Sequence, residues 1–317
     1  MIFIVIYYYL KLDIHMERKK NIIVTGGSGL VGKHLNKILP NAIYLSSQDC
    51  NLMNMNEIDS MMENYNPRIV IHLAAKVSGI LDNINYPVDY IEQNLIINGN
   101  LLRKCHEYNV ERVIAILSTC IYPDKADKYP MSEKNLFNGP PADTNFSYAL
   151  SKRAMAVHIE SYVKQYQKQW CYLIPCNLYG EYDKFEHHHS HFVSALIKKI
   201  YKAEDSIELL GSGKPLRQFM YADDLANIIK YFIDNNVNEN VNVAPNYTYS
   251  IDEIARIGIK SCGKEHLKII YKNQKLDGQF RKDVDSSKLL NIVGDFKFTS
   301  LEEGIKKVYD NFSKRYN

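Results

Sequence analysis

The chain has 317 residues, of which 46% are hydrophobic and 24% charged, and its formal net charge is +3. This composition excludes an intrinsically disordered chain, and the length allows one large domain or two modest ones around a sizeable core. Charges of both signs are mixed along the sequence, so no basic block indicates a nucleic-acid partner. The six cysteines form no Cys-x-x-Cys pair, which favours reduced thiols and a cytoplasmic location.

The first 20 residues do not resemble the start of a globular fold. Residues 1–10 are nearly all apolar or tyrosine, a run too short to span a bilayer. They also lack the basic region and the small-residue cleavage site of a signal peptide. We therefore interpret residues 1–20 as an N-terminal extension outside the fold and predict no membrane partner, with Met16 as an alternative candidate for the start.

A strand–glycine loop–helix pattern opens the predicted fold. The apolar strand 21–25 leads into Gly26–Gly32 and then into a helical pattern that ends near Leu39. A pyrophosphate needs close approach of the backbone and an open helix N-terminus, which this order of elements supplies. The predicted cofactor-binding residues here are Gly26, Gly29, Leu30, Val31 and Gly32, and a purely structural turn is the alternative.

The end of the second predicted strand, 42–45, bears on the choice of dinucleotide. An acid there would bind a ribose diol and favour NAD. Ser46 and Ser47 stand at that position instead, and the first acid is Asp49. Two hydroxyls suit a 2′-phosphate better, although no lysine or arginine accompanies them, so NADP(H) is favoured and NAD stays open. Further cofactor candidates are Ser47, Asn51 and Leu52, with a plain turn before a helix as the alternative for the last two.

Strands and helices then alternate along the first half of the chain. We predict helices at 55–65, 88–108 and 148–168 and buried strands at 68–75, 113–117 and 170–175. This alternation is typical of an α/β fold, here a doubly wound, parallel, Rossmann-type sheet with a smaller C-terminal substrate-binding lobe. The predicted dinucleotide domain covers 21–176, with 218–248 returning to it, and the lobe covers 177–217 and 249–317.

The second half of the chain shows weaker alternation. Residues 177–215 read as rich in loops, with a helix near 192–202. A helix is predicted to open at Tyr221–Ala226, and a short strand at 241–244 follows it. Ser250 stands three residues before an acid, which predicts a capped helix start.

Two short motifs in the first half carry candidate chemistry. Ser118 and Cys120 follow the buried strand 113–117, at the sheet edge where ligands bind, although a polar turn is the simpler reading. Tyr148 and Lys152 are four residues apart and share a helical face. A nearby ammonium is expected to lower the tyrosine pKa from about 10 and make the phenol useful in acid–base chemistry. The alternative is an exposed tyrosine beside a solvated lysine.

Together these motifs resemble the extended branch of the short-chain dehydrogenase/reductase superfamily, which acts on nucleotide sugars, and within it the GDP-L-fucose synthases. The resemblance runs from about Asn21 to the C-terminus. It rests on residues 72–77 (HLAAKV), 118–123 (STCIYP), 138–141 (NGPP), 175–180 (PCNLYG), 211–219 (GSGKPLRQF) and 277–282 (DGQFRK).

The resemblance implies a substrate, a cofactor and a division of catalytic roles. The substrate would be GDP-4-keto-6-deoxy-D-mannose, epimerised at C3 and C5 and then reduced at C4 by NADPH. Cys120 matches the base and His191 the acid of the epimerisation. Tyr148, assisted by Lys152 and Ser118, matches the proton donor of the reduction. Superfamily members are also dimers, so a homodimer is expected.

The resemblance also implies further binding residues. It adds Ala74, Ala75, Tyr148, Lys152, Pro175, Asn177 and Leu178 to the cofactor site. It assigns Asn177, His191, Lys199, Arg217, Asp277 and Lys282 to the substrate site. Two positions depart from the family pattern: Ser78 stands where a glycine is usual, and Gln48 occupies one candidate position for the residue that binds the 2′-phosphate.

Alternative functions remain open. A nucleotide-sugar 4-epimerase would hold NAD tightly and would not need Cys120 or His191, and a 4,6-dehydratase would usually carry an acid pair near 119–120. A non-catalytic dinucleotide sensor on the same fold would have a broken Tyr–Lys pair. The histidine tract 187–189 suggests metal binding, but no second cluster accompanies it, and we predict no metal site.

Overall fold

The computed structural model describes residues 21–185, 190–273, 277 and 279–316. The predicted extension 1–20 and the histidine tract 187–189 lie outside the described residues.

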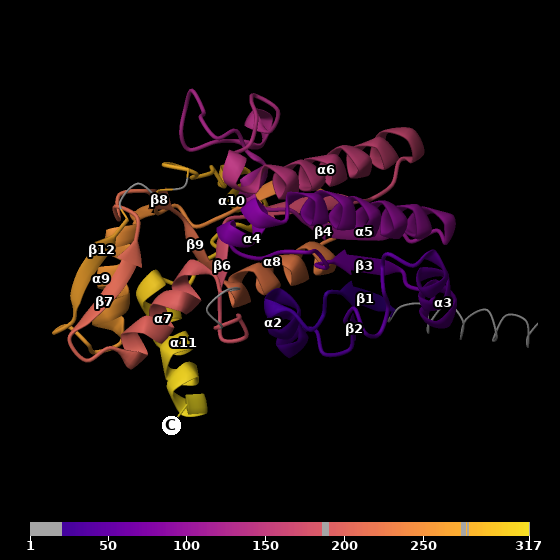
Figure 1. Cartoon of the computed structure of the whole chain (residues 1–317). Coiled ribbons are helices and arrows are strands. Elements are labelled where there is room, and N and C mark those ends of the chain that lie inside the picture. Colours follow the sequence, from indigo (N-terminus) through magenta and orange to yellow (C-terminus); the bar gives the residue numbers. More distant parts are fainter. Residues whose placement is uncertain (1–20, 186–189, 274–276, 278, 317) are drawn as a thin grey trace, which may run out of the picture.

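A six-stranded parallel sheet forms the centre of the molecule, in the order β10-β5-β4-β3-β1-β2 (Figure 1). Each neighbouring pair runs parallel, and in register Thr25 of β1 lies beside both His72 of β3 and Leu45 of β2. The strands are β1 (Ile22–Thr25), β2 (Ile43–Leu45), β3 (Ile69–His72), β4 (Arg112–Ile116), β5 (Cys171–Pro175) and β10 (Val241–Val243). The predicted doubly wound, Rossmann-type sheet is confirmed.

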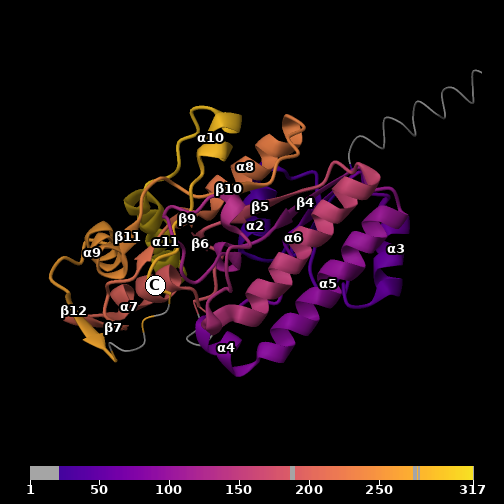
Figure 2. The same ribbon diagram turned by 90° about the horizontal axis from the view of Figure 1, so that it is seen from above.

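Helices cover both faces of this sheet. Helices α2 (Leu30–Ile38) and α8 (Ala222–Asp234) lie together on one face, below the sheet in Figure 1. The long helices α5 (Pro87–Glu107) and α6 (Phe146–Tyr166) run side by side on the other face (Figure 2), where α3 (Met55–Tyr65) joins them. The strands are therefore buried on both sides, which is why they read as continuous apolar runs.

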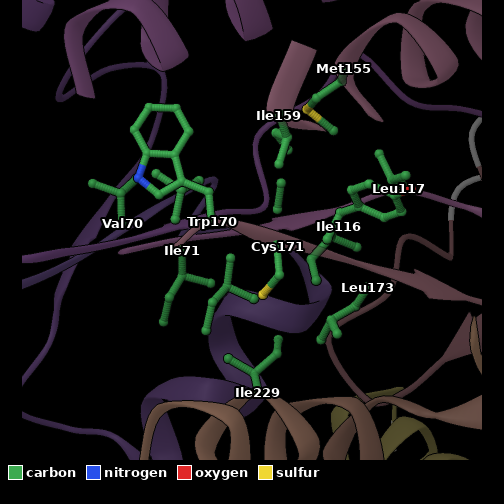
Figure 3. Close-up of a cluster of buried hydrophobic side chains, with 14 of the residues drawn as sticks. Val70, Ile71, Ile116, Leu117, Met155, Ile159, Trp170, Cys171, Leu173 and Ile229 are labelled. Atoms are coloured by element: carbon green, nitrogen blue, oxygen red, sulfur yellow. The ribbon is translucent and has the colours of Figure 1, made fainter. Parts of the chain in front are cut away.

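The main core is built from both helical layers against the sheet. Figure 3 shows Trp170, Met155 and Ile159 on one side of the strands and Ile229 of α8 on the other. All four of these side chains are at most 2% exposed. Burying each one is worth about 1.5–3 kcal/mol, so the core rather than any single polar contact holds the sheet edge in place.

A second hydrophobic core lies in the C-terminal part of the chain. Helices α7 (Phe192–Lys202), α9 (Ile251–Ser261) and α11 (Leu301–Tyr316) pack around it with the strand pair β7 (Ser206–Leu210) and β12 (Lys268–Lys272). The capped start at Ser250 is confirmed, because its hydroxyl accepts from Glu253 N and the Glu253 carboxylate accepts from Ser250 N. The remaining small elements are β6 (Asn177–Tyr179) with β9 (Phe219–Tyr221), β8 (Leu216–Arg217) with β11 (Tyr249–Ser250), α4 (Ile80–Asn85) and α10 (Ser287–Val293).

The structure differs from the sequence-based expectation in two places. Helix α4 was not predicted and precedes α5, which begins at Pro87 rather than 88. In 177–215 the predicted helix 192–202 is confirmed as α7, but the strands β6 and β7 in the same segment were not predicted. Both strands pair with segments far along the chain, β9 and β12, so the local sequence pattern carries little sign of them.

Candidate active site

The stretch after β4 forms a helical turn at the carboxyl edge of the sheet. A short 3-10 helix, Thr119–Ile121, follows Ser118, whose Oγ accepts a hydrogen bond of 3.3 Å from the backbone N of Cys120. Ser118 and Cys120 are both half-buried. The turn that the sequence suggested therefore presents a hydroxyl and a thiol at the edge where ligands of α/β sheets bind.

The glycine loop after β1 has no room for side chains. Gly26 adopts φ +71°, and a Cβ there would lie 2.7 Å from Ala74 N. A Cβ on Gly32 would lie 2.4 Å from Gly27 O. The N-cap of α2, Gly29, makes no side-chain capping bond and the first turn holds no acid, so the helix N-terminus is suited to an anionic group. Leu30, Val31, Ala74 and Ala75 are half-buried around this loop.

The turn after β2 is closed by an acid. The Asp49 carboxylate accepts from Ser46 N at 2.8 Å and from Ser46 Oγ at 2.6 Å, and these bonds lower the Asp49 pKa. Ser47 is exposed, and the Asn51 side chain accepts from Met53 N at 3.1 Å. Leu52 is buried in the main core, so its side chain contributes packing.

Tyr148 and Lys152 lie buried near the amino end of α6. The Lys152 ammonium donates to Ile116 O of β4 at 2.9 Å, and burial lowers the Lys152 pKa to about 7. Burial, with smaller effects from Cys120 and Tyr90, raises the Tyr148 pKa. The expected lowering of the Tyr148 pKa is therefore wrong, because desolvation of the phenolate dominates. A phenol with a raised pKa keeps its proton at neutral pH, so Tyr148 stands in the protonated form.

Cys120 faces a cation from the C-terminal part of the chain. The Lys282 ammonium lies 3.5 Å from Cys120 Sγ and 3.4 Å from Asn177 Oδ1. Burial opposes ionisation of the thiol, but Lys282, Ser118 and Arg217 together hold the Cys120 pKa below its ordinary value. The structure thus brings together predicted residues from β4, β6 and the 282 segment.

His191 is held by an acid that the sequence analysis missed. His191 is the N-cap residue of α7, and its Nδ1 lies 3.0 and 3.2 Å from the two carboxylate oxygens of Asp183. Ser194 Oγ donates to the same carboxylate at 2.5 Å. The hydrogen bond to Asp183 outweighs burial and raises the His191 pKa. No spacing rule pairs an acid with a histidine eight residues further along the chain, so no sequence signal pointed to Asp183.

The residue before His191 lies close to the segment that follows β3. A Cβ on Gly79, at the start of α4, would lie 4.0 Å from Ser190 O. Within the described ranges, no hydrogen bond joins His191 to Cys120. Cys120 and His191 thus come from different segments, the 3-10 turn after β4 and the start of α7.

The other predicted binding residues fall into two groups. Arg217 is half-buried beside Cys120 and donates to Leu216 O at 2.8 Å. Lys199 is engaged elsewhere, since its Nζ donates to Glu208 O at 2.6 Å. Asp277 accepts from Ser212 N at 2.7 Å and, like Cys120, opposes the burial that lowers the Arg217 pKa. Pro175 ends β5 beside Val243 and is buried, and Leu178 of β6 is half-buried.

Two negative findings hold for the described part of the chain. There, no group of three or more His, Cys, Asp or Glu side chains could hold a metal ion. The helices described include none long and apolar enough to cross a membrane. All six cysteines are free of disulfide bonds.

Residues 22–244, which carry the glycine loop, Ser118, Tyr148 and Lys152, match the NAD dependent epimerase/dehydratase family. The chain belongs to that family. This epimerase/dehydratase is 37% identical to a GDP-L-fucose synthase of Dictyostelium discoideum, over 94% of this chain and 97% of the relative. It is 34% identical to a GDP-L-colitose synthase of Yersinia pseudotuberculosis, over 93% and 99% of the two chains.

A solved structure shares the fold of this epimerase/dehydratase. The crystal structure of a GDP-L-fucose synthetase from Naegleria fowleri bound to NADP superimposes with a TM-score of 0.85. It has 32% sequence identity and covers 94% of each chain. The resemblance to GDP-L-fucose synthases predicted from the motifs is confirmed by these similarities.

Proposed function

We propose that the protein is a GDP-L-fucose synthase that epimerises GDP-4-keto-6-deoxy-D-mannose at C3 and C5 and reduces it at C4 with NADPH. The observation that carries the proposal is the Cys120 thiol beside the Lys282 ammonium, on the same sheet edge as Ser118. Neither a simple reductase nor a 4-epimerase needs such a thiol. Similarity to GDP-L-fucose synthases over nearly the whole chain supports the same reaction.

The glycine loop fits a dinucleotide cofactor. The backbone at Gly26, Gly29 and Gly32 and the uncapped N-terminus of α2 would hold the pyrophosphate of NADP(H). Ser47 and Asn51 are the candidates for contacts with the adenosine end, and Ala74 lies beside the glycine loop. When bound, NADPH supplies the hydride that reduces C4.

The epimerisation uses one base and one acid. A carbonyl at C4 acidifies the protons on C3 and C5, and the Cys120 thiolate is the group that removes them. The charge that develops on the carbonyl oxygen would be stabilised by hydroxyls from Ser118 and Tyr148. His191, whose pKa the hydrogen bond to Asp183 raises, returns a proton to the opposite face of the carbon.

The reduction uses the same hydroxyls in a second role. Tyr148 keeps its proton in the folded protein, so it can donate to the oxygen on C4 as that oxygen becomes an alkoxide. Lys152 lies one helical turn away and its low pKa allows it to exchange a proton near neutral pH. Asn177, Arg217 and Lys282 are the candidates for binding the GDP-sugar, and Arg217 suits a diphosphate oxygen.

The proposal includes a homodimer in the cytoplasm. Helices α5 and α6 lie side by side and carry exposed apolar residues: Leu95, Ile96, Val157 and Val163. A second copy that presents the same two helices would cover them in an isologous four-helix interface. The six unpaired cysteines support a reducing compartment.

Incubation of the protein with GDP-4-keto-6-deoxy-D-mannose and NADPH in D₂O tests the function. We expect GDP-L-fucose that carries deuterium at both C3 and C5. The acid exchanges its proton with D₂O, so the hydrogen that it returns to each carbon is deuterium. A reduced product without deuterium at these carbons would refute the epimerase. UDP- and dTDP-linked keto sugars serve as controls for the nucleotide.

The similarity to a GDP-L-colitose synthase supplies a second candidate function. L-Colitose is a 3-deoxy sugar, so its C3 has no stereocentre to invert. A protein that turns over only the 3-deoxy keto sugar, with inversion at C5 alone, would favour that candidate.

A further inference from the structure

We propose that Lys282 is a positioning residue that holds Cys120 as a thiolate, in addition to any contact it makes with substrate. The inference deepens the proposed function, on which it rests for the use of the thiolate in catalysis. The pairing itself rests on geometry alone and can be tested without substrate.

The Lys282 side chain is placed as a counter-charge for sulfur. It is 8% exposed, and its Nζ lies 3.5 Å from Cys120 Sγ and 3.4 Å from the Asn177 amide oxygen. Among the residues that the structure describes, it makes no ion pair with a carboxylate. A buried ammonium without an anionic partner is costly, so it favours the charged form of the neighbouring thiol.

The backbone around Lys282 is fixed by hydrogen bonds on both sides. Leu216 N donates to Phe280 O at 2.8 Å, and Met131 N donates to Asp283 O at 3.0 Å. Val284 N donates to the side chain of the buried Gln218 at 2.9 Å. These bonds set the direction of the Lys282 side chain before any ligand binds, which is what a positioning residue requires.

The neighbouring acid does not neutralise the ammonium. Asp283 is buried, and its two carboxylate oxygens are engaged by Arg281, at 2.6 Å from Nε and 3.0 Å from Nη2. The other titratable groups that face Cys120 are Arg217, which favours the thiolate, and Tyr148, which is neutral at physiological pH. The Cys176 thiol also lies near Lys282, but burial outweighs the effect of Lys282 and raises the Cys176 pKa. Lys282 is thus the nearer of two cations acting on the sulfur.

The pairing suits a base that must be restored after each proton transfer. In each epimerisation a C–H bond breaks, an S–H bond forms, and the electron pair moves to the carbonyl oxygen. His191 then supplies a proton to the carbon as the carbonyl re-forms. Cys120 is left as a thiol and His191 without its proton, and exchange with solvent resets both. The Lys282 Nζ, 3.5 Å from Cys120 Sγ, favours the thiolate form to which the thiol must return.

Ultraviolet absorbance of the thiolate, measured against pH, tests the inference. The Cys120 signal is the difference between the wild-type protein and the Cys120→Ser variant, and the same difference is measured in a Lys282→Met background. We expect the midpoint in the Lys282→Met background to rise by about one pH unit or more, as for loss of an opposite charge within 4–6 Å. In a Lys282→Arg background, the Cys120 midpoint should return most of the way to its wild-type value.

Lys288→Met is the matched control, since Lys288 pairs with Glu239 on the surface. It should leave the midpoint unchanged. Alkylation by iodoacetamide, mapped to Cys120 by mass spectrometry, should slow roughly tenfold at pH 7 in Lys282→Met, as the smaller thiolate fraction requires. The alkylation rate of free glutathione, measured in parallel, is the reference for reagent quality.

An unchanged Cys120 midpoint in folded Lys282→Met protein would overturn the inference and leave the proposed function standing. If Lys282→Met does not fold, Lys282→Gln supplies the same comparison with a polar side chain. A wild-type protein that shows the Lys282-dependent thiolate but incorporates no deuterium at C3 and C5 would instead overturn the proposed function and leave the pairing intact.

Discussion

At the residue scale, the contact between His191 and Asp183 sets the protonation of the proposed acid. The carboxylate is 9% exposed and accepts from both His191 and Ser194. The folded protein therefore holds the histidine proton more tightly than the unfolded chain does, since the His191 pKa is raised from 6.5. The stability that this proton contributes is complete below about pH 6.5 and is lost as pH rises through the folded pKa.

Asp183→Asn is predicted to move the alkaline limb of the pH profile of kcat to lower pH. Removing an adjacent negative charge lowers the His191 pKa by about one unit, so epimerisation at pH 8 should fall roughly tenfold. Deuterium incorporation at C3 and C5 against pH measures the limb. Ser194→Ala removes one bond from Asp183 and keeps its charge, so its limb should move less. If the alkaline limbs of Asp183→Asn and the wild type fall at the same pH, the prediction is contradicted.

The sequence identified the proposed catalytic side chains and Lys282, but not Asp183, which pairs with His191. Ser118, Cys120, Tyr148 and Lys152 could be predicted because each stands beside a recognisable strand or helix. Asp183 could not, because a separation of eight residues from His191 fits no helix or strand spacing. The direction of the Tyr148 pKa shift could not be predicted either, because it depends on how deeply the phenol is buried in the fold.

At the scale of elements, the junction between β1 and α2 is the most constrained. A Cβ on Gly32 would lie 2.4 Å from Gly27 O, which is backbone and has no easy way to move. The glycine therefore sets how closely the helix packs on the loop, and with it the position of the helix N-terminus.

Gly32→Ala is predicted to weaken NADPH binding by at least about tenfold. Overpacking of this kind costs about 1–3 kcal/mol, and here it displaces the loop that would hold the pyrophosphate. Fluorescence titration with NADPH measures the affinity. Gly99→Ala is the matched control, because Gly99 lies within α5 and a Cβ there meets nothing within 4 Å. It should bind NADPH as the wild type does and be slightly more stable. Equal affinity in both variants would refute the role given to Gly32.

Element prediction succeeded where periodicity is local and failed where it is not. Strand β4 and helix α3 could be read from their own residues, and the observed α3 bounds equal the predicted 55–65. Strand β6 is three residues long and exists because β9 pairs with it. A segment of that length has no pattern of its own until its partner is known.

At the scale of the whole molecule, the exposed apolar surface of α5 and α6 is the proposed dimer interface. Ile96→Asp is predicted to convert the dimer to a monomer, because it places a charge within an interface that must bury about 1,200–2,000 Å². Sedimentation velocity measures the mass. Leu210→Asp is the control: Leu210 is 64% exposed on β7, away from these helices, and its charge should leave the dimer intact. A wild-type protein that sediments as a monomer would refute the interface.

The pairing of Cys120 with Lys282 also bears on the order in which the protein is made. These residues are 162 positions apart. During synthesis, β5 emerges long before β10, so the growing sheet has an unpaired edge until Val241–Val243 arrives. Cys120 emerges earlier still and has no ammonium beside it until the 282 segment is in place. The nascent chain thus carries an ordinary thiol, and the reactive form arises only when the chain is nearly complete.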